Sequence, residues 1–333
     1  MVPRWCYYYC AMHLWCFISC SWVQYIFGVK SLVLCIVSYI AQWRIYFIII
    51  SLEVGCLEDW ERALNLGKAN LDTSAKSKCA RTRFTLGLLA LHNFQYDMAM
   101  EIFENADATE QSESKRGYPM AMWGAAMATT QILWQTSDCE KGKEYMKRIP
   151  SKPNWITEKE KAYIRTGFAL YPNYLSCDHD KDQKTRERRF MKAMGRVVTS
   201  YPDEKEAALF KAVSSEAVAA QRVDKEGKEA RIKVLETLEE QIPNHSGLIH
   251  YITHVFDTPE LYTEGNRIFL REMKTAYDQR NHAASMGIRA AKNYPRVANS
   301  SCHALHMPSH IYMRIGDWSN SLESNLASIK VMS

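Results

Sequence analysis

The sequence predicts an all-α fold from about Leu57 to the end of the chain. Amphipathic stretches with helical periodicity follow one another there, separated by short polar connections. No alternating apolar and polar run joined by an Asn-Gly or Asp-Gly turn occurs, so strand signals are sparse. Small and aromatic residues also recur at junctions between expected helices, which is typical of stacked helix pairs in a helical-repeat solenoid.

Each expected helix is an apolar-periodic run that ends at a group of Ser, Asp, Lys, Gly or Pro residues. The predicted helices are 57–69, 78–92, 95–107, 118–135, 140–147, 157–169, 185–200, 203–219, 225–241, 246–256, 260–276, 282–291 and 308–330, the last with a break near Gly316-Asp317. The main loops are expected at 108–117, 148–156 and 171–184.

Residues 1–56 form a hydrophobic N-terminal segment, which we predict to be separate from a helical-repeat domain at 57–333. Two nearly uncharged stretches, 5–28 and 31–52, are each close to the ~20 residues that a bilayer span requires. The segment suits a membrane anchor, a signal sequence or a buried helix, and its abrupt Cys, Trp and Tyr bias is also typical of sequence that is not genuinely coding. We favour a membrane-associated N-terminus that contains a transmembrane helix. The alternative is a cytoplasmic protein.

The composition excludes some classes of function. The 333 residues are 47% hydrophobic and carry a net charge of +5, which is enough apolar material for a sizeable core. Three of the positive charges lie in the first 50 residues, so the remainder is nearly neutral, and no basic stripe interleaved with aromatic residues occurs. We therefore expect no nucleic-acid partner. The ten cysteines include no CxxC pair.

Two histidine clusters carry the strongest chemical signal. His250, His254 and Asp257 have the spacing i, i+4, i+7, which places them along one side of a helix. A second cluster, at positions 303, 306 and 310, has the spacing i, i+3, i+7. Because imidazole is the commonest protein ligand of transition metals, two facing helices with such clusters predict a shared metal site.

We rank His250, His254, His306 and His310 as the first candidates for metal ligands. His303, His245 and His92 form a second rank, and Asp257 is expected to ligate the metal or to orient a histidine. Pro308 cannot lie inside a helix without loss of a hydrogen bond, so a helix is expected to begin near Met307 with Pro308 in its first turn. Zn, Fe and Cu all suit such a donor set.

Two segments match the repeat pattern of tetratricopeptide proteins. Phe94 to Ala106 has the order aromatic-x2-Ala-x3-Phe-x2-Ala of a second repeat helix, and Arg314 to Ser321 places Gly, an aromatic and a small residue where two helices meet. More specifically, residues 244–254 (NHSGLIHYITH) and 303–312 (HALHMPSHIY) resemble a family of largely uncharacterised, mostly bacterial tetratricopeptide-repeat proteins with HYxxH and HALHMPSHI motifs.

The resemblance covers about residues 80–330 and implies an α-solenoid whose first helices line a concave surface. It implies no particular reaction. The chain departs from the family at Ser246, where Pro is usual, in an extra stretch at Glu260–Asn281, and at Ser333, where relatives continue with more repeats. The extra stretch bears directly on whether the two histidine clusters can meet.

The sequence leaves two classes of function open. One is a metal-binding protein, which includes a metal-dependent enzyme with an open coordination position. The other is a scaffold without catalytic activity that binds a peptide or protein partner in its concave groove. No GxGxxG, P-loop, GxSxG or HExxH motif is present, so nothing supports dinucleotide binding, phosphoryl transfer or the familiar hydrolases.

Overall fold

A computed structural model of the chain describes residues 65–134, 136–172, 175, 177, 180–219, 225–257 and 277–332. The predicted N-terminal hydrophobic segment 1–56 and the predicted helix 260–276 lie outside these residues. The described residues up to Asn325 belong to one compact unit of the chain, Cys56–Asn325.

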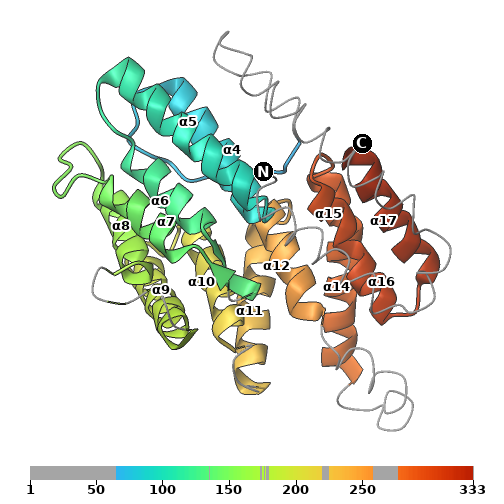
Figure 1. Cartoon of the computed structure of the whole chain (residues 1–333). Helices are drawn as coiled ribbons and strands as arrows, with labels where there is room; N and C mark the ends of the chain where they lie inside the picture. The colour runs from blue at the N-terminus through green and yellow to red at the C-terminus, as the bar shows by residue number, and fades with distance from the viewer. Residues whose placement is uncertain are drawn as a thin grey trace. The chain divides into compact units, whose positions relative to one another are not determined.

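The described part of the chain is helical, which confirms the all-α prediction (Figure 1). Its first half contains α4 (Lys78–His92), α5 (Tyr96–Ser114), α6 (Pro119–Ala128), α7 (Cys139–Lys147), α8 (Glu158–Leu170), α9 (Asp180–Ser200) and α10 (Lys205–Ala219). The second half contains α11 (Lys225–Gln241), α12 (Ser246–Phe256), α14 (Tyr277–Val297), α15 (Cys302–His306), α16 (Pro308–Arg314) and α17 (Trp318–Met332).

The strands of the described residues form one small antiparallel hairpin. β1 (Thr130–Gln131) pairs with β2 (Thr136–Ser137), and the 3-10 turn η1 (Ile132–Trp134) connects them. The predicted helix 118–135 was therefore too long, because α6 ends at Ala128. The Thr129 hydroxyl donates a hydrogen bond to the Ala126 carbonyl at 2.8 Å, and the Asp138 amide donates to the Thr129 carbonyl at 2.9 Å, which turns the chain into the hairpin.

Other predicted boundaries were wrong. Helix α9 begins at Asp180, inside the predicted loop 171–184, and α14 is longer at both ends than the predicted helix 282–291. Residues 65–69 of the predicted helix 57–69 are not helical, and Lys68 forms an isolated parallel bridge with His245. Helix α5 continues through most of the predicted loop 108–117 and ends only where Lys115 adopts a left-handed conformation, with φ of 59°. Glu110 explains the extension, because its carboxylate accepts hydrogen bonds from the Lys76 and Ser77 amides at 3.0 and 2.8 Å and so ties this part of α5 to the start of α4.

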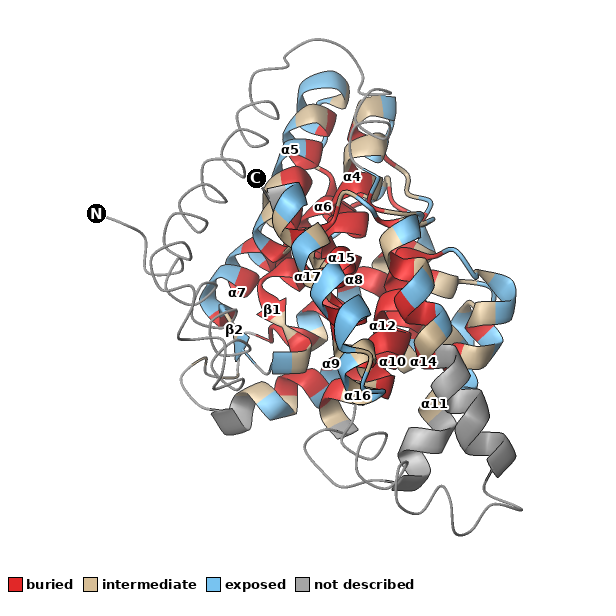
Figure 2. Cartoon of the chain, turned by 90° about the vertical axis from the view of Figure 1, so that its right-hand side faces the viewer, coloured by how far each residue is buried: buried red, intermediate tan, exposed pale blue. Residues whose placement is uncertain are grey.

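Helices that follow one another in the sequence pack against each other. This holds for α4 with α5, α5 with α6, α8 with α9, α9 with α10, α11 with α12 and α12 with α14 (Figure 1). Small residues permit the closest approaches: a Cβ at Gly124 would lie 2.5 Å from the ring of Phe103, and one at Gly87 would lie 2.9 Å from it. The core is continuous through these contacts, and Figure 2 shows the buried residues gathered where the helices meet.

Helix α12 is the most enclosed element near the histidines. Every residue of Ser246–Phe256 except His254 is buried, and the helix packs against α4, α10, α11, α14 and α16. A helix buried on all sides can hold polar side chains only where partners satisfy their hydrogen bonds.

A disulfide, Cys139–Cys177, joins α7 to the connection that precedes α9. Among the described helices, none has the length and apolar character needed to cross a bilayer.

Candidate metal centre

Helix α12 presents two histidines one turn apart. His250 is fully buried and His254 is partly buried, and their Nε2 atoms lie 3.1 Å apart. The i, i+4 spacing therefore places both imidazoles on one face of the helix, as predicted, with their Nε2 atoms close together. Asp257 follows as the C-cap residue of this helix.

Helices α15 and α16 present the second cluster. The Ser301 hydroxyl accepts a hydrogen bond from the Ala304 amide at 3.2 Å and so caps α15, while Pro308 stands in the first turn of α16, as predicted. Within this cluster, His303 is the residue that contacts His250. Its Nε2 atom is 2.9 Å from Nε2 of His250.

His250, His254 and His303 thus form a group whose ring nitrogens lie close enough together to ligate one metal ion. The two clusters meet despite the extra stretch at Glu260–Asn281, because α12 packs against both α14 and α16. His303, a second-rank candidate ligand from the sequence, contacts His250 directly. His306 and His310 form an adjoining pair, with their Nε2 atoms 3.0 Å apart.

A backbone carbonyl sets the tautomer of His250. Its Nδ1 atom lies 2.6 Å from the carbonyl oxygen of His92. Because a carbonyl oxygen can only accept, Nδ1 carries the ring proton and donates a hydrogen bond to that oxygen. The lone pair then resides on Nε2 and points at His254 and His303. A buried imidazole that donates through one nitrogen and offers the other is the usual form of a metal ligand.

Burial keeps these imidazoles neutral. It lowers the pKa of His250 and His303 well below the ordinary value, with a further decrease from the neighbouring histidines. The pKa of His254 is lowered to about 3, mainly by burial and then by His310. Neutral imidazoles are the form that binds metal ions, so protons compete weakly for this site near neutral pH.

Asp257 lies beside the second pair rather than in the group of three. It accepts hydrogen bonds from Nδ1 of His310 and from Nε of Arg314, both at 2.8 Å. Burial alone would raise the pKa of Asp257, but these two partners lower it to about 2. Asp257 is therefore a carboxylate that orients His310, which was one of the two roles expected for it.

His92 belongs to a second group of possible metal ligands with Glu206 and His245. Glu206 accepts hydrogen bonds from Nε2 of His92 at 2.7 Å and from Nε2 of His245 at 2.8 Å. Burial would raise the pKa of Glu206, yet the two histidines hold it well below its usual range. Burial raises the pKa of the Tyr251 hydroxyl, which therefore keeps its proton and donates to Nδ1 of His92 at 2.8 Å. Both ring nitrogens of His92 are thus engaged, and its carbonyl supports His250.

Aromatic side chains pack against the group of three, and the sequence alone did not reveal this. The ring centroid of Phe94 lies 4.2 Å from that of His250, 5.5 Å from His254 and 5.9 Å from His303. Trp134, in η1, has its ring 5.9 Å from His254. Phe94 adopts φ of 56°, which is rare for an aromatic residue, and this turn of the chain aims its ring at the imidazoles.

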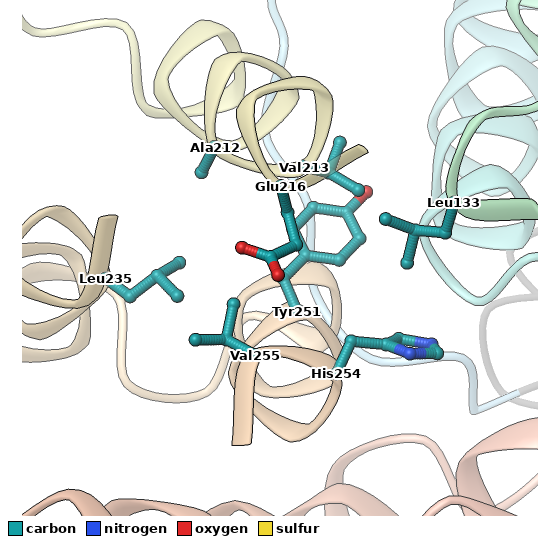
Figure 3. A pocket seen from close by; sticks show the side chains of 8 residues that line it. All are labelled: Leu133, Ala212, Val213, Glu216, Leu235, Tyr251, His254 and Val255. Carbon is teal, nitrogen blue, oxygen red and sulfur yellow. The ribbon is translucent and has the colours of Figure 1, made fainter. Parts of the chain in front are cut away.

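His254 also lines a small apolar pocket (Figure 3). Ala212, Val213 and Glu216 from α10, Leu235 from α11, Leu133 from η1, and Tyr251, His254 and Val255 from α12 line it. Glu216 is the acidic member of this lining, and it accepts a hydrogen bond from Nε of Arg231 at 2.7 Å. The pocket therefore offers an apolar space next to one of the three imidazoles.

The fold and this centre define an all-α helical protein with a group of histidines, one buried and two partly buried, that could hold a metal ion. No protein-family model matches the chain, and the comparison with curated proteins finds no match either.

Proposed function

We propose that this protein binds a transition-metal ion through Nε2 of His250, His254 and His303. The convergence of these three nitrogens carries the proposal, because Nε2 of His250 has a single lone pair and can accept a hydrogen bond from only one of its two imidazole neighbours. A proton can bridge either His250 and His254, at 3.1 Å, or His250 and His303, at 2.9 Å, but not both, whereas one metal ion can bind all three nitrogens.

The distances fit an ion with imidazole ligands. Ligand bonds of ~2.0–2.1 Å in tetrahedral geometry place nitrogens roughly 3.3 Å apart. The contacts of 3.1 and 2.9 Å are within a few tenths of an ångström of that value. Zn, Fe and Cu all accept such a donor set.

We further propose that the bound ion acts in catalysis. Three protein ligands leave a fourth position for water or substrate, which distinguishes catalytic from structural metal sites. A metal ion there supplies a water of lowered pKa or, for Fe or Cu, a place to bind dioxygen. His254 and His303 are only partly buried, which leaves a side of the group open to a water or a small substrate.

For the fold we propose a tetratricopeptide-like solenoid. The successive packing of α4 with α5 and of α5 with α6, with glycines at the closest approaches, supports this arrangement. So does the resemblance of the NHSGLIHYITH and HALHMPSHIY segments to tetratricopeptide-repeat proteins with such motifs. In such a fold, a peptide or protein partner would occupy the concave side.

Metal content tests the first part of the proposal. Purified full-length protein should carry Zn, Fe or Cu, or take up Zn²⁺ after treatment with a chelator, as measured by plasma mass spectrometry. The His303→Ala variant should bind at least 10-fold more weakly. Phe168→Ala serves as the control, since it removes a 43% exposed side chain outside both groups of possible ligands, and it should bind as the wild type does. Protein that takes up no Zn²⁺ would refute the proposal.

A spectroscopic titration tests the catalytic part. Co²⁺ bound to three histidines with an open position should show visible absorption bands that shift when azide is added, because azide enters the open position. If Co²⁺ binds and its spectrum ignores azide, the site is closed and structural, and the enzymatic proposal fails while metal binding stands.

A further inference from the structure

We propose that His306 and His310 hold a second transition-metal ion beside the first, so that the centre is dinuclear. This inference rests on the proposed function, since it extends the group formed by His250, His254 and His303. It assigns to His306 and His310 a site of their own instead of a share in a single site.

The tautomer of His310 is set by Asp257. The Nδ1 atom of His310 donates to the Asp257 carboxylate at 2.8 Å, and Nε of Arg314 donates to the other carboxylate oxygen at 2.8 Å. Arg314 therefore holds the carboxylate in place. With its proton on Nδ1, His310 directs the lone pair of Nε2 at His306. A carboxylate behind a histidine in this way also increases the basicity of the ligating nitrogen.

The tautomer of His306 is set by Asn325. Nδ2 of Asn325 donates to the Ser321 carbonyl at 2.9 Å, which fixes the orientation of the amide and leaves its oxygen facing His306. Nδ1 of His306 lies 2.7 Å from that oxygen and donates to it. Nε2 of His306 is then an acceptor too, and it faces Nε2 of His310 at 3.0 Å.

Two acceptor nitrogens at this separation require a cation between them, either a proton or a metal ion. Each imidazole already has an acceptor behind it that orients Nε2 inward, and Asp257 adds a negative charge that favours a metal cation. Asp257 lies three residues after His254 in the sequence, and the rings of His303 and His306 are centred 6.4 Å apart. The two groups are therefore neighbours.

The pair would supply two protein ligands, and solvent would complete the coordination of the second ion. We expect this ion to bind more weakly than the first, which has three imidazoles. Two adjacent ions can hold the attacking and leaving atoms of one substrate, as in two-metal hydrolases, or the two ends of one small ligand.

The stoichiometry of Zn²⁺ binding tests the inference. Full-length protein, freed of metal by a chelator and titrated with Zn²⁺, should bind two ions per chain, and the variant H306A/H310A should bind one. Asp257→Asn, which preserves shape and so guards against a folding defect, should weaken the second ion by about 10- to 100-fold and leave the first unchanged. Circular dichroism melts of each variant show whether it is folded.

The outcomes are distinguishable. A wild type that binds one ion, with H306A/H310A also binding one, would mean that the two nitrogens share only a proton, and would overturn the second site alone. If H306A/H310A instead abolishes a single ion, the two groups share one ion and the inference again fails. Loss of one ion in His245→Gln would place the second ion with Glu206 and would also overturn it. No uptake at all would refute the proposed function itself.

A magnetic measurement gives an independent readout. Protein loaded with two equivalents of Cu²⁺ should show an electron paramagnetic resonance signal that is broadened or weaker than two isolated ions, because neighbouring Cu²⁺ ions couple. The H306A/H310A variant should show the sharp signal of one isolated Cu²⁺. A wild-type signal that integrates to two isolated ions would refute adjacency.

Discussion

At the scale of single residues, the backbone around Phe94 places an aromatic ring against the histidines at a conformational cost. A left-handed φ of 56° costs an L-residue about 1–2 kcal/mol. Asn93 holds the turn in place, because its side-chain amide donates to the Leu66 and Leu89 carbonyls at 2.9 and 2.8 Å and its oxygen accepts from Tyr294 at 2.8 Å. This combination of strain and firm support is typical of functional sites.

Truncation of Phe94 should therefore affect both stability and the site. We expect Phe94→Ala to lower the free energy of unfolding by about 3–5 kcal/mol, because a buried ring is removed, and to increase the exposure of His250 to water. Urea titration measures the first effect. Phe168, 43% exposed, is the matched control, and Phe168→Ala should change stability by less than about 0.5 kcal/mol. Equal effects of the two variants would contradict the packing role of Phe94.

The pKa values of the three histidines predict acid sensitivity of the metal-free protein. Their pKa values in the folded state lie below the unfolded value of 6.5, and that of His254 is about 3. The stabilisation from neutral burial is therefore fully present above pH 6.5 and is lost as the pH falls, since the unfolded chain binds protons first. Each such histidine costs about 1.4 kcal/mol per pH unit below its unfolded pKa.

We expect the free energy of unfolding of the metal-free protein to fall by about 1–4 kcal/mol between pH 7 and pH 5.5. Urea titrations over this range measure it. The His303→Gln variant should show a shallower dependence on pH, because it has one fewer buried imidazole. A wild-type stability that is constant over this range would show that these histidines are not held neutral by burial.

At the scale of elements, Gly247 allows α12 to approach the end of α4. A Cβ at this position would lie 2.5 Å from Nδ1 of His92, and that ring has no room to move because it is fully buried and hydrogen-bonded to Glu206 and Tyr251. The carbonyl oxygen of His92 accepts a hydrogen bond from Nδ1 of His250. The approach of these two helices therefore determines how the first metal ligand is oriented.

Gly247→Ala should be destabilising by about 1–3 kcal/mol and should weaken Zn²⁺ binding. Gly195, in α9, is the matched control, because the nearest atom to a Cβ there is the flexible end of Lys211, 3.8 Å away. Gly195→Ala should be neutral or stabilising by up to about 1 kcal/mol. Thermal melts and Zn²⁺ titrations of both variants measure this, and similar behaviour of the two would disprove the close-approach argument.

At the scale of the whole molecule, the Cys139–Cys177 disulfide ties a connection to the helical core. It closes a loop of 38 residues in sequence, which restricts the unfolded chain. The double variant Cys139→Ser, Cys177→Ser should therefore be less stable by about 2–4 kcal/mol in urea titrations under oxidising conditions. Its Zn²⁺ stoichiometry should equal that of the wild type, since neither cysteine belongs to the centre. Unchanged stability would show that the bridge does not constrain the unfolded chain.

Local pattern was sufficient for much of the helical architecture. The ranges 78–92, 225–241 and 246–256 agree with α4, α11 and α12, and Pro308 begins α16 as its chemistry requires. The errors at 57–69 and in the loop 108–117 share a cause. Contacts distant in sequence decide these boundaries, namely the hydrogen bond from the Ser77 amide to Glu110 and the bridge between Lys68 and His245.

By itself, the sequence determined the helices and the side of each helix on which its histidines lie, because spacing along a helix is a local property. Only the tertiary structure decided how the histidines are grouped: His303 meets His250 and His254, His306 pairs with His310, and His92 turns to Glu206. It also supplied the acceptors that orient each imidazole, namely a carbonyl, a carboxylate and an amide from other elements. The physical reason is that imidazole tautomers and their convergence depend on how helices pack, which no periodicity within one helix encodes.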